Sequence, residues 1–307
     1  MSIKKFKFKK FIYALAPMAG VTDFAFREIC SELGADLVVT EMISAKALEY
    51  NNKRTQKMLK ENSTCLKAIQ LFGHDEASVA KVVSSGILDS FDIIDFNCGC
   101  PAKKIVSNSD GSAMMRDIEH TKKVLQAVRN NTTKPISVKF RLGIDNNINY
   151  IEFAKMCESV GADFITLHAR TREQGYSGKV DVNAYKLLID SVDIPVIWSG
   201  DIKATKDAQY AKSIGCAGVM IGREALGNPE IFSHLKRKKI NKTRKEIVLQ
   251  HLNNMRDYFG SDDTTFSYFK KHLLWYLKNH PNASELKKQV CFMTNLQQMY
   301  NFIENNI

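Results

Sequence analysis

The most informative stretch of the sequence is Asp95-Phe96-Asn97-Cys98-Gly99-Cys100-Pro101-Ala102-Lys103-Lys104. It follows a short apolar run over residues 91–96, which is typical of a buried strand. Gly99 and Pro101 then predict a tight loop. Two thiols, an amide and two cations therefore lie on a loop that a sheet holds in place, where α/β proteins often do chemistry. The loop alone is compatible with a disulfide, a metal site, a redox pair or one acidic thiol.

Similar apolar runs recur along the chain, with stretches of helical spacing between them, such as 118–129 and 151–160. Glycine precedes several of the runs, as in Gly34-Ala35-Asp36 and Gly161-Ala162-Asp163, and stops the preceding helix. The expected strands cover residues 13–16, 37–40, 66–70, 93–97, 136–140, 164–168, 196–199 and 218–221. Eight such β-then-α units predict a (β/α)8 TIM barrel, and a doubly wound open sheet is the alternative.

Unusual polar residues follow nearly every one of these strands. The carboxyl ends of the strands form the active-site face of such barrels, so we expect one site there. The candidates, in chain order, are Pro17, Met18 and Ala19, Glu41, Gln70, Asn97 to Cys100, Lys139 with Arg141, His168 with Arg170, Ser199-Gly200-Asp201, and Gly222-Arg223. The last two groups follow strands seven and eight, where barrels of this kind commonly bind a phosphate. A phosphate-bearing cofactor is therefore favoured, with Arg223 as a bidentate partner.

Composition points to the class of partner. The formal net charge is +11, which indicates a polyanion, nucleic acid first and an acidic membrane surface second. The sequence has no apolar run long enough to span a membrane. A basic run that includes Lys4, Lys5 and Lys10 precedes a short apolar segment closed by Pro17, which we interpret as a lead-in to the first strand and not as a signal peptide. A cytoplasmic protein is expected.

The seven cysteines, at positions 30, 65, 98, 100, 157, 216 and 291, form no C-x-x-C pair and have no histidine at zinc spacing. We therefore expect no metal site, and most of the thiols should be small buried residues.

The pattern changes near residue 232. A densely basic segment over 234–245 is interpreted as a linker or a phosphate-facing strip, and three or four amphipathic helices follow it. One of them is expected to begin near Ser284, its candidate N-cap. We predict a barrel domain over 1–238 and a small helical bundle domain over 239–307. The bundle is expected to expose cations beside aromatic residues, namely Lys270, Lys271, His272, Trp275 and Tyr276.

These motifs resemble those of the tRNA-dihydrouridine synthases, flavin enzymes that reduce a uridine in tRNA to 5,6-dihydrouridine. The resemblance spans the barrel in order, and the bundle is similar to the bacterial B-type branch through Lys270-Lys271-His272 and Trp275-Tyr276. Ser199 stands where an asparagine is often found. The matching pieces are residues 16–23, Glu41-Met42, residues 70–73, 97–104, 138–143 and 167–172, Gly200-Asp201-Ile202, and Gly222-Arg223.

The resemblance implies FMN as cofactor, NADPH as electron donor and tRNA as substrate. By motif position, Pro17, Met18 and Ala19 would line the flavin ring, and Gln70, Lys139 and His168 would contact it. Ser199, Gly200, Asp201, Gly222 and Arg223 would hold the ribityl phosphate. Cys100 corresponds to the proton donor of the family, and Asn97 and Arg170 would face the uracil. Monomer is a plausible oligomeric state.

The chemistry agrees with these assignments. Reduction of a C5=C6 double bond needs a hydride at C6, which reduced FMN supplies, and a proton at C5. A cysteine thiol is mostly protonated at neutral pH and can donate that proton. The target base must also leave its stack, which suits a protein that grips RNA phosphates. Two alternatives remain: an FMN barrel dehydrogenase that acts on a free pyrimidine, and a catalytically silent RNA-binding protein on an inherited barrel.

Overall fold

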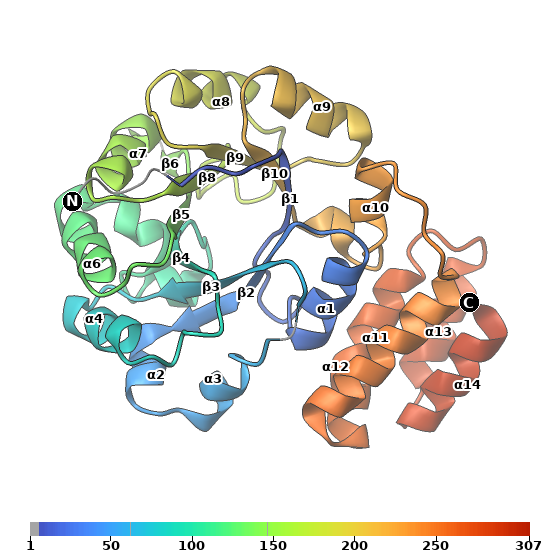
Figure 1. Ribbon diagram of the computed structural model, residues 1–307. Coiled ribbons are helices and arrows are strands. Elements are labelled where there is room, and N and C mark those ends of the chain that lie inside the picture. The colour runs from blue at the N-terminus through green and yellow to red at the C-terminus, as the bar shows by residue number, and fades with distance from the viewer. Residues whose placement is uncertain (1–5, 62, 146) are drawn as a thin grey trace.

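The computed structural model describes residues 6–61, 63–145 and 147–307. Lys4 and Lys5 of the predicted basic lead-in lie outside these residues. Eight parallel strands close into a barrel in the order β1-β10-β9-β8-β5-β4-β3-β2 (Figure 1). The predicted TIM barrel is confirmed, and every expected strand is present. The strands are β1 (Ile12–Leu15), β2 (Leu37–Ser44), β3 (Leu66–Phe72), β4 (Ile93–Cys98), β5 (Ile136–Arg141), β8 (Phe164–His168), β9 (Val196–Ser199) and β10 (Gly218–Ile221).

Helices surround the barrel, and short polar residues start them. Asp23, Asp75, Asp117 and Asp181 each accept a backbone N–H bond at a helix N-terminus. The main outer helices are α1 (Phe24–Glu32), α4 (Glu76–Ser84), α6 (Ile118–Asn130), α7 (Tyr150–Ser159), α8 (Val182–Ile189) and α9 (Thr205–Ser213). Shorter elements are α2 (Ala45–Glu49), α3 (Lys53–Lys57), α5 (Lys103–Val106), the 3-10 helices η1 (Gly111–Met115) and η2 (Arg223–Ala225), and the hairpin of β6 (Gly143–Ile144) and β7 (Asn147–Ile148).

An apolar plug closes the barrel at the amino ends of its strands. Phe6 and Phe8 pack there against Phe164, with the rings of Phe8 and Phe164 5.0 Å apart. Below the rings the interior holds small and aliphatic side chains from β1, β2, β3, β4, β9 and β10. The opposite, carboxyl end of the barrel is therefore the end at which a ligand can enter.

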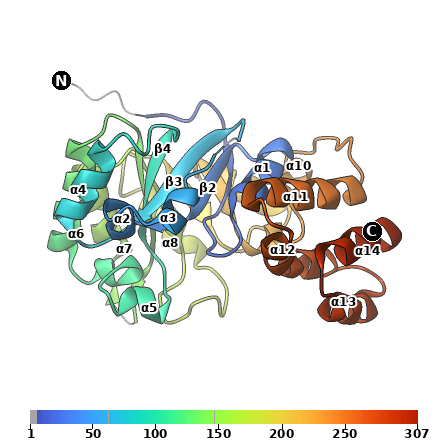
Figure 2. The same cartoon turned by 90° about the horizontal axis from the view of Figure 1, so that it is seen from below.

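Four helices follow the barrel, joined to it through α10 (Ile231–Leu235). They are α11 (Arg244–Phe259), α12 (Asp262–Tyr276), α13 (Ala283–Phe292) and α14 (Leu296–Asn306). They enclose a core of their own, which includes Leu252, Leu273 and Met299, and one barrel residue, Ala25 of α1, joins that core. Helix α11 packs against α1, and the four helices lie beside the barrel in both views (Figures 1 and 2). The predicted boundary at 238/239 falls in the connection between α10 and α11.

The expected start of α13 is wrong by two residues. The N-cap is Asn282, and Ser284 lies in the first turn of the helix together with Glu285. No described helix is both long and apolar enough to cross a membrane.

The basic segment over 234–245 is not a free phosphate-facing strip. Lys236 pairs with Asp36 at 2.7 Å, and Lys242 pairs with Glu32 at 2.9 Å. Arg244 pairs with Glu230 at 2.7 Å and also donates to the carbonyl oxygens of Gly227 and Tyr276. These ion pairs tie the connection and α11 to the barrel, although the side chains of Lys242 and Arg244 remain 45% and 41% exposed. Arg237, Lys238 and Lys239 are exposed as well.

Two residues expected on the exposed face of the bundle are buried. His272 is 1% exposed and Tyr276 is 3% exposed. The Nε2 atom of His272 lies 3.6 Å from the carboxylate of Asp23, the N-cap of α1. His272 therefore contributes to the contact between barrel and bundle, because it lies on the same helical stripe as Phe269 and Leu273.

Candidate active site

The carboxyl ends of the strands surround a cavity of about 580 Å³. Asn97 and Cys100 line this cavity together with every residue predicted to bind the cofactor: Pro17, Met18, Ala19, Gln70, Lys139, His168, Ser199, Gly200, Asp201, Gly222 and Arg223. The volume lies within the usual range for small-molecule and cofactor sites. The barrel thus brings these positions together, and their individual roles remain predictions.

A buried hydrogen-bond chain connects three of the strands beneath the cavity. The carboxylate of Asp95 accepts from Ser137 Oγ at 2.5 Å and from Gln70 Nε2 at 2.7 Å. Since Gln70 donates to a carboxylate, its oxygen faces Asn97, whose Nδ2 donates to it at 2.7 Å. Burial raises the pKa of Asp95 to about 6, against the opposing effect of its two donors. The chain fixes both amides in one orientation.

Asn97 also organises the cysteine loop. Its side-chain oxygen accepts from the backbone N–H of Gly99 at 3.2 Å and of Cys100 at 3.0 Å. The carbonyl of Cys100 accepts in turn from the N–H of Ser112 at 3.0 Å. A Cβ on Gly111 would come within 2.9 Å of that carbonyl, so the backbone of η1 supports the loop closely. The loop is held from both sides, which places Cys100 at the cavity wall.

The two thiols of the loop have different environments. Cys98 is completely buried at the end of β4, and burial raises its pKa well above its usual value. Cys100 is partly exposed and lines the cavity. All seven cysteines are free thiols, and four of them are buried. Among the described residues, no three His, Cys, Asp or Glu side chains are grouped so that they could hold a metal ion.

Lys139 projects from β5, beside Asn97 in the register of the sheet. Burial lowers the pKa of its ammonium to about 8, Arg141 lowers it further, and Asp95 acts in the opposite direction. Arg141 also lines the cavity, and it donates to the carbonyl oxygens of Gly99 and Thr171 at 2.8 and 3.0 Å. Two cations from one strand thus face the same cavity.

His168 is held as a neutral imidazole. Burial lowers its pKa to about 2, and the neighbouring cations, Lys139 first, lower it further. Its Nε2 lies 3.2 Å from Nη1 of Arg170, which can only donate. Nε2 is therefore the acceptor, and the proton resides on Nδ1.

Arg170, which was expected to face the uracil, does not line the cavity. Its side chain is 1% exposed and forms an ion pair with Asp201 at 2.6 Å. It also donates to the carbonyl oxygens of Ser177 and Gly178. Arg170 is thus a buried residue that positions His168 and Asp201, because all of its donors are turned toward the protein.

The loop after β9 leaves no room for a side chain at its glycine. Gly200 has a φ of 113°, and a Cβ there would lie 2.8 Å from Cδ2 of His168. Asp201 follows with a φ of 53° and accepts from Arg223 at 3.3 Å. The guanidinium of Arg223 lies 4.8 Å from the ring centre of Tyr176. The backbone at Gly200 and the guanidinium of Arg223 thus form this wall of the cavity, a combination that suits a phosphate.

Three residues of the site were not assigned a role from the sequence. Tyr176 lies on the loop after β8 and lines the cavity beside Arg223, but a single tyrosine in a polar loop gives no pattern. Asp95 belongs to the stretch quoted at the start of the sequence analysis. A carboxylate inside an apolar strand must find hydrogen-bond donors, so its position alone could have marked it as part of the site. Arg141 follows Lys139 by two residues, so both side chains point to the same side of β5. This spacing could have predicted that Arg141 lines the cavity together with Lys139.

Comparison with known proteins identifies the family of this chain. The model of the dihydrouridine synthase family matches residues 14–307. A "tRNA-dihydrouridine synthase B" of Vibrio parahaemolyticus is 35% identical, over 89% of this chain and 88% of that protein. A "Probable tRNA-dihydrouridine synthase" of Helicobacter pylori is also 35% identical, over 97% and 92%.

Solved structures support the fold. Morphinone reductase superposes with a TM-score of 0.55 at 10% identity, covering 75% of this chain and 87% of that one. A variant of NCR from Zymomonas mobilis superposes with a TM-score of 0.53 at 15% identity, covering 76% and 88%. The family match extends over nearly the whole sequence, both barrel and bundle. The chain belongs to the dihydrouridine synthase family.

Proposed function

We propose that this protein reduces the C5=C6 bond of uridine in tRNA to give 5,6-dihydrouridine, with FMN as bound cofactor, NADPH as electron donor and Cys100 as proton donor. The observation that carries the proposal is that the partly buried Lys139 and the thiol of Cys100 line one cavity. A cation and a proton donor around a single pocket are the groups that this reduction requires of the protein.

The residues of the cavity fit FMN. Lys139, Arg141 and Arg223 give the cavity a cationic lining, which favours a cofactor with a phosphate. Gly200 allows the backbone to approach a ligand closely, and the protonated Nδ1 of the neutral His168 can donate to a carbonyl oxygen. When bound and reduced, FMN supplies the hydride that C6 of the uracil must receive.

The protein supplies the proton. The S–H bond of Cys100 breaks as a new C–H bond forms at C5, which leaves a thiolate beside Lys139 and Arg141. Both cations lie close enough to Cys100 for electrostatic interaction, so they stabilise the negative charge that develops on sulfur. Asn97 holds the backbone of Cys100 and so sets the position of the thiol, and we propose that it also borders the uracil.

The substrate class rests on charge, on the helical domain and on the names of the relatives. The net charge of +11 favours a polyanion over a free pyrimidine. We propose that residues 1–238 carry the flavin chemistry and that 239–307 form a tRNA-binding domain in a cytoplasmic enzyme. The exposed cations of the connection, Arg237, Lys238 and Lys239, are available to RNA phosphates.

The experiment combines the purified protein with NADPH and either tRNA, uridine or uracil, and maps dihydrouridine in the RNA. We expect a non-covalently bound FMN that NADPH bleaches, and reduction of tRNA alone. Turnover of uridine or uracil at the rate found with tRNA would favour a free-pyrimidine dehydrogenase. Bound FAD, or no flavin at all, would contradict the cofactor assignment.

A further inference from the structure

A second cavity, of about 770 Å³, lies directly behind one wall of the proposed active site. The loop after β1 separates the two cavities: Met18 and Val21 line the first, whereas Gly20 and Asp23 line the second. Strand β2 also lies between the two cavities, because Met42 lines the first cavity and Glu41 lines the second. A ligand in the second cavity would therefore lie one loop away from a base held in the first.

Aromatic rings from the helical domain form the far wall of this cavity. The ring centres of Tyr258 and Phe259 lie 4.9 Å apart, and those of Phe259 and Tyr268 lie 4.7 Å apart. All three side chains are partly exposed and line the cavity. Burial raises the pKa of Tyr258 to about 12, so its hydroxyl stays protonated and donates to the carbonyl of Lys57 at 2.9 Å. Tyr258 is also stacked on Phe24, with the ring centres 5.4 Å apart. These contacts hold the rings in place, and each ring keeps part of its surface exposed at the cavity, where a base could contact it.

Cations from the barrel form the near wall. Arg54, Lys57 and Lys60 all line the cavity, and all three are exposed. Nη2 of Arg54 lies 3.5 Å from the hydroxyl of Tyr268. The ammonium of Lys271 lies 5.2 Å from the centre of the Tyr268 ring, and it would be 3.4 Å from a Cβ on Gly20. Positive charge therefore surrounds the aromatic wall, the combination that proteins use to hold single-stranded nucleic acid.

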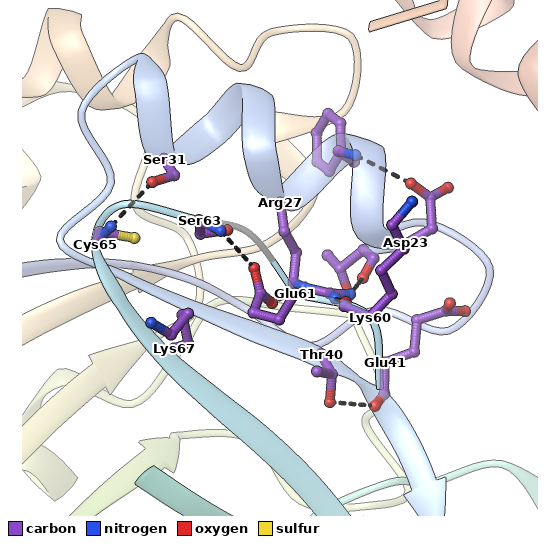
Figure 3. Close-up of polar contacts among 12 residues, drawn as sticks. Asp23, Arg27, Ser31, Thr40, Glu41, Lys60, Glu61, Ser63, Cys65 and Lys67 are labelled. Carbon is purple, nitrogen blue, oxygen red and sulfur yellow. Dashed lines mark hydrogen bonds and ion pairs between the residues drawn. The ribbon is translucent and has the colours of Figure 1, made fainter. Parts of the chain in front are cut away.

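A buried arginine holds the near wall rigid. Arg27 of α1 donates to the carbonyl oxygens of Thr22 and Lys60 at 2.7 and 2.8 Å, and it pairs with Glu61 at 2.7 Å. Figure 3 shows Arg27 lying between the start of α1 and the segment that carries Lys60 and Glu61. One side chain thus fixes both the loop that separates the cavities and the backbone that presents Lys60.

The carboxylate of Glu41 can accept a hydrogen bond from a nucleobase. Its Oε1 accepts from the backbone N–H of Gly20, while in the described part of the chain no hydrogen-bond donor reaches its Oε2. Burial raises the pKa of this carboxyl. In Figure 3 the carboxylate points away from Arg27 and Glu61, on the side of the loop where Asp23 lies. A carboxylate in this position can accept from the amino group of a nucleobase.

We propose that this second cavity binds one unpaired nucleotide of the RNA substrate, close to the target uridine in sequence. The base stacks on Tyr268 and its neighbours and donates an amino group to Glu41, while Arg54, Lys57 and Lys60 hold the flanking phosphates. The inference rests on the proposed function, since it takes RNA as the substrate. It adds a contact that distinguishes one sequence or loop context of uridine from another.

The test measures binding of a fluorescent tRNA to the full-length protein, so it does not depend on turnover. Tyr268→Leu and Arg54→Ala are compared with Lys122→Ala, which removes one exposed cation from α6 on the barrel. Each variant is titrated with a series of tRNAs in which one nucleotide near the target uridine is abasic. Stacking of one base predicts a Kd for intact tRNA that is raised roughly 5- to 100-fold by Tyr268→Leu. Arg54→Ala should raise the Kd by several-fold and reduce its salt dependence, and Lys122→Ala should change neither.

The abasic series identifies the nucleotide. At one position, the abasic tRNA should bind wild type more weakly, and Tyr268→Leu should cause no further loss with that tRNA, because both changes remove the same contact. Additive losses at every position would overturn the proposal, as would equal effects of Arg54→Ala and Lys122→Ala. A raised KM for NADPH with an unchanged Kd for tRNA would also overturn it, by assigning the cavity to the reductant. If wild type binds the tRNA but reduces no uridine, the proposed function fails while this series still decides the subsite.

Discussion

The side-chain oxygen of Asn97 accepts a hydrogen bond from the backbone N–H of Cys100 at 3.0 Å, while its amide nitrogen donates to Gln70 at 2.7 Å. A single side chain therefore couples the position of the thiol to the buried chain that runs through Gln70 to Asp95. These hydrogen bonds hold the loop in its observed shape.

Asn97→Ala should loosen this loop without removing Cys100, the proposed proton donor. Misplacement of a reacting group by about 1 Å can cost on the order of 10²-fold in rate, and we expect a loss of roughly 10- to 100-fold in reduction of tRNA. Single-turnover oxidation of the reduced enzyme by tRNA measures it. An unchanged rate would show that the hydrogen bonds from Asn97 do not set the position of Cys100.

Gly200→Ala should abolish retention of the cofactor. The new methyl group would lie 2.8 Å from His168 Cδ2 and the same distance from Val180, so the wall next to the cavity must move. Gly178→Ala is the matched control, because Gly178 also has a positive φ, of 65°, but nothing lies within 4 Å of its Cβ position. The flavin that remains bound after gel filtration is the readout. Equal flavin content in the two variants would refute the close approach at Gly200.

Arg27→Met should strongly destabilise the fold. The side chains of Arg27 and Glu61 are 2% and 1% exposed, so the variant removes the cation that pairs with a buried carboxylate, which keeps its hydrogen bond from the backbone N–H of Ser63. Removing one member of a buried pair typically costs about 3–5 kcal/mol. Chemical denaturation measures the loss, and the double variant Arg27→Met with Glu61→Gln should recover part of it. A loss below about 1 kcal/mol would contradict this prediction.

Acid should destabilise the contact between barrel and bundle through His251. Burial lowers the pKa of this histidine to about 3, His272 lowers it further, and Asp23 opposes both. In the unfolded chain a histidine has a pKa near 6.5, so between these values the unfolded state binds more protons. The stability that neutral His251 contributes is therefore fully present above about pH 6.5 and is lost as the pH falls toward 3.

His251→Asn removes this titration. The free energy of unfolding of the variant should fall less steeply on acidification, by up to about 1.4 kcal/mol per pH unit. Denaturation midpoints of both proteins between pH 4 and 7 give the comparison. Parallel curves would show that His251 is protonated in the folded protein as easily as in the unfolded one.

The strands of the barrel could be predicted because each is a short apolar run, and most of them carry a polar residue at or near the carboxyl end, such as Asn97 in Ile93–Cys98 and His168 in Phe164–His168. The expected strand positions also place Gln70, Asn97, Lys139 and His168 at one cavity, because the parallel strands of a barrel end at a common face. Local pattern was sufficient for these features.

Long-range pairing could not be predicted. Lys236 and Arg244 looked free in a basic segment, but their partners are Asp36, far away in sequence, and Glu230 together with two carbonyl oxygens. Arg170 resembled a substrate ligand by motif, whereas its contacts with Asp201 and two backbone carbonyls depend on a loop fold that no local pattern encodes. The burial of His272 could have been predicted, because it lies three residues after Phe269 on an apolar helical stripe.

The central claim is that Cys100, and not Cys98, protonates the substrate. The direct measurement is single-turnover oxidation of pre-reduced enzyme by tRNA, which excludes the NADPH step, with Cys100→Ala and Cys98→Ala compared at equal flavin content. General-acid catalysis contributes on the order of 10²–10⁴-fold, so Cys100→Ala should be slower than wild type by that factor while it retains NADPH oxidation. Cys98→Ala should stay close to the wild-type rate, since Cys98 is buried in the barrel wall. A slow Cys98→Ala with a fast Cys100→Ala would contradict the assignment of the proton donor.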